Sequence, residues 1–189
     1  MTDLEKMEQR LSENYDELKW LYCELYHNDM GALTYFLTVL RRCYDERKPA
    51  LRALDSARLA DPGWYRSNKL LGMMMYTEAF AGDLNGVRER LPYIEECGGN
   101  WLHLMPLLRT VKSRSDGGYA VADFRTVQPE LGTMEDLEAL ADVCRERGIC
   151  LCLDFVMNHT SEDHEWAKRA RRGEKEFQDR YFFFENWEI

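Results

Sequence analysis

The stretch "CLCLDFVMNHTSEDHEW", residues 150–166, decides the fold of this chain. It begins with a continuous apolar run, which is typical of a buried β-strand. The run ends in a carboxylate, Asp154, and Asn158 and His159 follow shortly after it. Polar side chains directly after a buried strand make the end of that strand a candidate binding site.

Three apolar runs of strand length predict β-strands at 70–76 ("LLGMMMY"), 101–105 ("WLHLM") and 149–155 ("ICLCLDF"). A helix is expected between each pair. The first begins after Asp83, and the second begins with Thr133 and Asp136 as a capping-box-like start. Strands alternating with helices, and apolar on both faces, predict an α/β fold with a parallel sheet covered by helices. We expect the three strands to be adjacent, in chain order.

Two architectures fit this order, a doubly wound open sheet and a (β/α)₈ barrel. Neither a GxGxxG nor a Walker sequence follows any predicted strand, which argues against nucleotide binding. Residues 1–66 have apolar positions at helical spacing and are predicted to form a helical N-terminal domain. Residues 67–189 are predicted to form the α/β domain.

The composition excludes several function classes. The net charge is −9, and the one basic run, "KRARRGEK" at 168–175, is interpreted as a solvated helix face, so no nucleic-acid partner is expected. No apolar run reaches the roughly 18 residues of a membrane span. The charged N-terminus does not resemble a secretory signal, and no two of the six cysteines form a CxxC pair. A reduced, cytoplasmic protein is therefore expected.

The polar residues of interest follow the second and third predicted strands. The long connection 107–132 contains "SDGGY", with Asp116 and Tyr119, and His159 follows the third strand. Each alone is ordinary, as a turn, core or surface residue. A carboxylate, an aromatic ring and an imidazole on one rim together make a sugar-binding set. No metal is expected, because His159 and His164 lack the HExxH spacing. No cofactor is expected either. The acids Glu162, Asp163 and Glu165 are expected to face solvent.

The sequence "LDFVMNHTSEDHEW" (153–166) resembles the third-strand signature D-x-V-x-N-H of the α-amylase superfamily of glycoside hydrolases. The segments "SDGGYAV" (115–121) and "ALDSARLADPGWYRSNKLLG" (53–72) further resemble amylosucrase and the related sucrose hydrolases. The resemblance covers nearly the whole chain. It implies the first three β/α units of a TIM (β/α)₈ barrel, preceded by an α-helical segment, with the barrel incomplete in this chain.

The resemblance also implies roles for individual residues. The residue matching Asp116 anchors the far hydroxyls of a glucosyl unit, that matching Tyr119 stacks on the sugar, and that matching His159 hydrogen-bonds the glucosyl ring. Asp154 and Asn158 shape the rim from behind, and no metal is expected at Asn158. The implied partner is a small sugar substrate, sucrose or an α-glucan. The oligomeric state is left open.

Retaining glycoside chemistry needs two carboxylates about 5 Å apart. In this superfamily the nucleophile follows the fourth strand and the acid/base the fifth, so no catalytic residue is expected within these 189 residues. We therefore expect carbohydrate metabolism by α-retaining glucosyl transfer or hydrolysis at the family level, and an inactive chain in isolation. The alternatives are an α-glucosidase, a sucrose phosphorylase or a trehalose-forming isomerase, or a non-catalytic truncated product.

Overall fold

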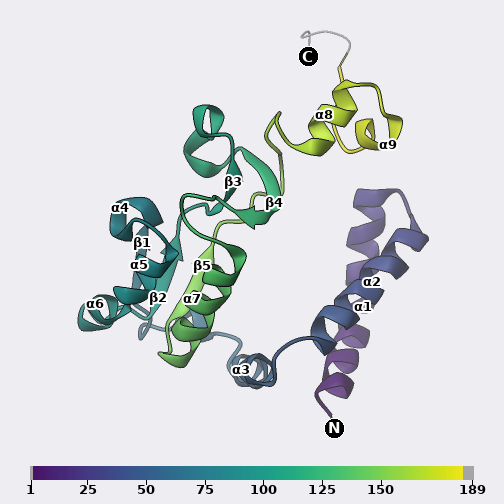
Figure 1. Ribbon diagram of the computed structural model, residues 1–189. Coiled ribbons are helices and arrows are strands. Elements are labelled where there is room, and N and C mark those ends of the chain that lie inside the picture. Colours follow the sequence, from purple (N-terminus) through teal and green to yellow (C-terminus); the bar gives the residue numbers. More distant parts are fainter. Residues whose placement is uncertain (1, 185–189) are drawn as a thin grey trace. The chain divides into compact units, whose positions relative to one another are not determined.

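The computed structural model describes residues 2–184 of the protein (Figure 1). The chain separates into two compact units, Met1–Arg66 and Ser67–Ile189. Contacts are dense within each unit, and each unit has helices of its own. The two units are described separately below.

The first unit is helical, with α1 (Asp3–Tyr26), α2 (Met30–Asp45), α3 (Pro49–Ala60) and the short η1 (Trp64–Arg66). A capping box formed by Thr2 and Glu5 begins α1. Helices α1 and α2 run antiparallel, as shown by the ion pair between Arg41, near the end of α2, and Glu8, near the start of α1. Three apolar side chains of these two helices are buried, those of Met7, Leu33 and Leu37.

The second unit is built on a three-stranded parallel sheet in the order β1–β2–β5. The strands are β1 (Gly72–Met75), β2 (Trp101–Leu104) and β5 (Cys150–Leu153). This confirms the three expected strands, their parallel direction and their order. Each strand is shorter than the apolar run that predicted it, because the ends of the runs belong to the connecting segments.

Helices α4 (Thr77–Ala81), α5 (Leu84–Glu89) and α6 (Leu91–Glu96) connect β1 to β2. The expectation of one helix there was wrong in detail, since the helix breaks at Arg90. Pro92 follows the break, and proline lacks the N–H that a continuous helix would need. Helix α7 (Met134–Glu146) precedes β5, and its capping box between Thr133 and Asp136 is confirmed.

The core lies between the sheet and helices α5, α6 and α7. Side chains from these elements and the adjoining loops are almost fully buried there, namely Leu84, Val87, Leu91, Ile94, Leu102, Leu104, Leu107, Val127, Leu140, Cys144 and Ile149. Burial of this apolar surface is the main force that holds the helices on the sheet.

The two faces of the sheet differ in their covering. Along β2, Leu102 and Leu104 point into the helical core, whereas Trp101 and His103 point to the opposite face and are half-buried. Neighbours in register on parallel strands share a face, so Met74 and Cys152, both paired with His103, lie on that face too. Met74 is 66% exposed. Among the described residues, helices thus cover one face, and the other is the face that a closed barrel turns inward.

The long connection after β2 contains structure that the sequence reading missed. It holds an antiparallel pair, β3 (Leu108–Thr110) and β4 (Val121–Val127), with the short η2 (Lys112–Arg114) and η3 (Asp116–Gly118) between them. Figure 1 shows this pair beyond the carboxyl ends of the parallel strands. After β5 come α8 (Glu165–Arg171) and α9 (Lys175–Gln178). None of the helices within residues 2–184 has the length and apolar character of a membrane span.

Candidate functional site

The "SDGGY" segment forms a tight turn in which three consecutive residues have positive φ, namely Asp116 (49°), Gly117 (65°) and Gly118 (98°). The Ser115 carbonyl accepts hydrogen bonds from the N–H groups of Gly118 and Ala120 and so closes the turn. At Gly118 a Cβ atom would lie 2.9 Å from Cβ of Pro106, so the turn requires glycine for both its conformation and its close packing.

Tyr119 leaves this turn and links the two polar segments that follow β2 and β5. Its hydroxyl donates a hydrogen bond to Oδ2 of Asp154, 3.2 Å away. Its main-chain oxygen lies 3.2 Å from Nε2 of His159. A carbonyl oxygen can only accept, so Nε2 of His159 carries the proton in this contact. Burial, and then the neighbouring Asp154 carboxylate, raise the pKa of Tyr119 above its ordinary value.

The structure therefore brings Tyr119, Asp154 and His159 together, although they are up to 40 residues apart in the chain. Asp116 joins them through the backbone, since its carbonyl accepts the N–H of Tyr119. Asp116 is exposed, and within residues 2–184 its carboxylate makes no hydrogen bond or ion pair. Asn158 is exposed beside His159. The sugar-binding roles of these residues remain predictions.

A hollow of about 460 Å³ adjoins His159 and Asn158. Aromatic and aliphatic side chains form much of its wall, and its lining consists of Phe124, Phe155, Val156, Met157, Asn158, His159, Thr160, Trp166, Arg180, Tyr181 and Phe182. A smaller hollow of about 250 Å³ adjoins Gly117 and Gly118 on the other segment. Apolar walls with a few polar groups are typical of small-molecule sites.

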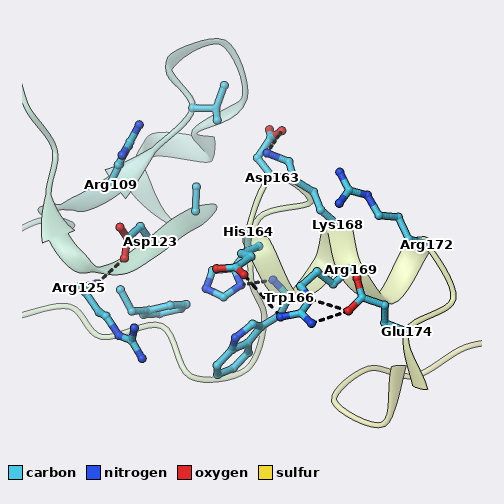
Figure 2. Close-up of a pocket in the computed structure, with 14 residues that line it drawn as sticks. Arg109, Asp123, Arg125, Asp163, His164, Trp166, Lys168, Arg169, Arg172 and Glu174 are labelled. Atoms are coloured by element: carbon cyan, nitrogen blue, oxygen red, sulfur yellow. Dashed lines mark hydrogen bonds and ion pairs between the residues drawn. The ribbon is translucent and has the colours of Figure 1, made fainter. Parts of the chain in front are cut away.

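A larger groove of about 790 Å³ lies between β4 and α8 and is shown in Figure 2. Its carboxylates already have partners within the chain. Asp163 pairs with Arg114 at 2.7 Å and with Lys168 at 3.5 Å. Glu174 pairs with Arg169 at 2.6 Å. None of the predicted sugar-contact residues lines this groove, so its size does not make it the candidate site.

The same ion pairs correct one expectation about the acids after β5. Asp163 was expected to face solvent, but its side chain is only 13% exposed, because Arg114 from the preceding connection and Lys168 from α8 enclose it. Glu162 is about half exposed and pairs with Arg114 and Arg171. The acidic cluster thus fastens the segment after β5 to the segment after β2.

His164 has a structural position that the sequence did not reveal. It precedes α8, and its Nδ1 atom accepts a hydrogen bond from the N–H of Trp166 at 3.1 Å. Figure 2 shows the ring beside Trp166, and Phe124 packs against it as well, with ring centroids 5.0 and 5.7 Å away. Burial lowers the pKa of His164 from its ordinary value.

Two further residues near the site, His103 and Tyr76, were not predicted from the sequence. Nε2 of His103 lies 3.3 Å from Oδ1 of Asp154. The hydroxyl of Tyr76 lies 3.4 Å from the Gly117 carbonyl, to which it donates. His103 lies inside an apolar run of the sequence. Its side chain points to the opposite face of the sheet from those of its neighbours Leu102 and Leu104. The pairing of β2 with β5, which fixes that face, could not be read from either run alone.

A metal site was not predicted, and the described part of the chain contains no group of three His, Cys, Asp or Glu side chains that could hold a metal ion. All six cysteines are free thiols. The groups that the site presents are the imidazole of His159, the carboxylate of Asp154 and the phenol of Tyr119, all of which can form hydrogen bonds.

Comparison with known proteins identifies the family. The family described as "Alpha amylase, catalytic domain" matches residues 45–188. The chain belongs to the alpha-amylase family. This family membership accounts for the Asp154–His159 signature and for a parallel sheet that forms part of a TIM barrel.

Among curated proteins, this alpha-amylase family chain is 39% identical over 118 residues to the trehalose synthase/amylase TreS of Mycobacterium tuberculosis, covering 60% of this chain and 19% of that protein. It is 39% identical over 100 residues to Maltase 1 of Drosophila virilis, covering 53% of this chain and 16% of that protein. The chain thus spans about a fifth of the length of these relatives or less.

Among solved structures, the trehalulose synthase MutB from Pseudomonas mesoacidophila matches with a TM-score of 0.59 and 29% identity, over 66% of this chain and 23% of that one. A MutB mutant in complex with the substrate sucrose matches with a TM-score of 0.58 and 30% identity, over 67% and 23% of the two chains. The relatives therefore include proteins that handle sugar substrates, as the alpha-amylase family membership leads one to expect.

Proposed function

We propose that this chain supplies the glucosyl-binding wall of an enzyme that transfers or hydrolyses α-glucosyl units. The observation that carries the proposal is the linkage of Tyr119 to both Asp154 and His159 at the carboxyl end of β5. In a (β/α)₈ barrel this end of the strands is where substrates bind.

The chemistry of these side chains suits a pyranose. The Asp116 carboxylate and the His159 imidazole are hydrogen-bonding groups of the kind that sugar hydroxyls require. The ring of Tyr119 is held by its hydroxyl group, so its face can pack against the apolar face of a sugar. Asp154 and Asn158 support the rim.

The finer proposal is an amylosucrase-like activity on sucrose or α-glucans. It is supported by the "SDGGYAV" segment and by the helical residues before the barrel strands. The names of the relatives favour a second candidate, an α-glucosidase or an isomerase that forms trehalose or a sucrose isomer. Both candidates share an α-glucoside substrate and a retaining mechanism.

The retaining mechanism requires a nucleophile and an acid/base about 5 Å apart. The two carboxylates assigned to this site are Asp116 and Asp154, which accepts the Tyr119 hydroxyl, and the family resemblance gives both a binding or supporting role. We therefore propose that residues 1–189 hold a glucosyl unit without turning it over, since binding alone does not stabilise a transition state.

Binding selectivity tests the proposal. Methyl α-glucoside, sucrose, maltose and trehalose are titrated into the 189-residue chain, with methyl α-galactoside as the epimer that differs at one far hydroxyl. We expect the glucosides to bind and the galactoside to bind more weakly, with the preference lost in Asp116→Asn. Asp45→Asn, an exposed position in the helical unit, is the matched control. Equal binding of both epimers would refute the assigned role of Asp116.

A further inference from the structure

His103 is a polar residue in the centre of a strand whose neighbours are apolar. Leu102 and Leu104 on either side of it point into the helical core and are fully buried. His103 points to the opposite face, where Cys152 is its neighbour in register on β5. Asp154 stands two residues beyond Cys152, so the alternation of β5 directs its carboxylate toward the same face.

The contact between the two side chains is close. Nε2 of His103 lies 3.3 Å from Oδ1 of Asp154, and both side chains are about one quarter exposed. The Nε2 atom is itself buried, and within residues 2–184 it has no partner aligned for a hydrogen bond. Both observations hold if the His103 ring and the Asp154 carboxylate attract each other electrostatically without forming a well-directed hydrogen bond.

The other oxygen of the same carboxylate is also engaged. Oδ2 of Asp154 accepts the hydroxyl hydrogen of Tyr119 at 3.2 Å. A carboxylate that is held at both oxygens has little freedom to rotate about its terminal torsion, which is otherwise broad. The chain of contacts therefore runs from His103 through Asp154 to Tyr119, and from the Tyr119 carbonyl to His159.

We propose that His103 is a positioning residue that fixes the Asp154 carboxylate and thereby the orientation of Tyr119 and His159. This inference rests on the proposed function, because it concerns the residues that would hold the glucosyl unit. The contacts themselves do not depend on that function. The alternative is that His103 only fills space on the inner face of the sheet.

Two amide substitutions separate positioning from packing. In His103→Gln the side-chain nitrogen reaches about as far as Nε2, whereas in His103→Asn it is one methylene shorter and falls short of Asp154. Both variants place a polar amide on the strand, so any general cost of altering β2 is shared. Cys152→Ala changes the volume beside His103 but leaves both members of the contact in place, and it serves as the packing control.

The readout is amide hydrogen exchange in the segment 115–121, measured on the 189-residue chain by mass spectrometry. This segment contains Tyr119 and the turn before it, and its exchange does not require any sugar. We expect His103→Asn to raise exchange there about fivefold, the effect of one weakened polar contact, and His103→Gln and Cys152→Ala to leave it near the wild-type rate. Exchange in α7 reports whether the fold is intact.

A double-mutant cycle tests whether His103 affects the segment 115–121 through Asp154. Asp154→Asn alone should raise exchange in 115–121, and adding His103→Asn to it should have no further effect, because the shared partner is already altered. Equal exchange in the Gln and Asn variants, or additive effects in the double variant, would overturn the inference. Sugar affinity is measured separately, so a chain that fails to bind glucosides but shows this coupling would refute the proposed function and leave the inference standing.

Discussion

The Nε2 atom of His159 lies 3.2 Å from the main-chain oxygen of Tyr119, which joins the loop after β5 to the loop after β2. The contact fixes Nε2 as the protonated nitrogen when the ring is neutral, and Nδ1 is then the acceptor. A ligand hydroxyl that donates to this ring would therefore meet Nδ1.

His159→Ala should weaken binding of a glucoside about tenfold, since it removes a hydrogen-bonding ring and loosens the Tyr119 loop. His159→Gln should lose less, because its amide nitrogen can still donate to the Tyr119 carbonyl. Titration calorimetry of both variants with methyl α-glucoside checks the order. If the two substitutions were equally harmful, the link to Tyr119 would not contribute.

Gly118→Ala should destabilise the barrel-forming unit by more than a substitution that introduces positive-φ strain alone. Gly148 provides the comparison, since it also has positive φ but has no atom within 4 Å of a built Cβ. Alanine in the left-handed region costs about 1–2 kcal/mol at either position. The contact with Pro106 should add at least about 1 kcal/mol at Gly118. Urea unfolding of both variants measures the difference, and equal values would show that the turn can shift away from Pro106.

Stability should fall as the pH drops below 6.5, the ordinary pKa of histidine, partly because of His164. Burial lowers its folded-state pKa, an effect that nearby Arg125 and Arg180 reinforce and Asp123 and Glu165 oppose. The unfolded chain therefore takes up the proton first, so the stabilisation is complete above pH 6.5 and is lost as the pH falls through the folded-state pKa.

His164→Asn tests this contribution because asparagine can still cap α8 but does not titrate. We expect the variant to lose less stability than the wild type between pH 7.5 and 5.5, as measured by denaturant midpoints. Parallel pH profiles for the two proteins would show that His164 is not responsible.

The sequence was sufficient to predict the parallel strands, because each is an apolar run followed by a helix with recognisable caps such as Thr133 and Asp136. It was not sufficient for β3 and β4, whose residues are mixed in polarity and whose pairing contains register shifts. It also missed the break at Arg90, where helical periodicity continues through a proline.

For the candidate site too, some residues could be predicted from the sequence and others could not. Asp154 and His159 were predicted because they follow a strand and match a family signature, and Tyr119 because it follows the glycine pair; their roles stay predictions. His103 was missed, since its role depends on the register between β2 and β5. His164 was missed because its burial arises from Phe124 and Trp166, which approach it in the folded chain.

The 189-residue chain should release no glucose or fructose from sucrose above the rate in buffer, because the binding residues alone provide no nucleophile and acid pair. Coupled enzymatic detection of glucose is sensitive enough to decide this. Release that disappears in His159→Ala would mean that these residues do perform the chemistry.

The most direct test of the glucosyl-binding wall uses the four histidines of the chain as reporters. The chain is labelled with ¹³C at histidine Cε1 and titrated with sucrose, and the signals are assigned by single substitutions. We predict that the His159 signal moves saturably, that His103 follows with a smaller shift, and that His27 in the helical unit stays fixed. A His159 signal that does not move, or equal movement of all the signals, would contradict the assignment of the sugar site.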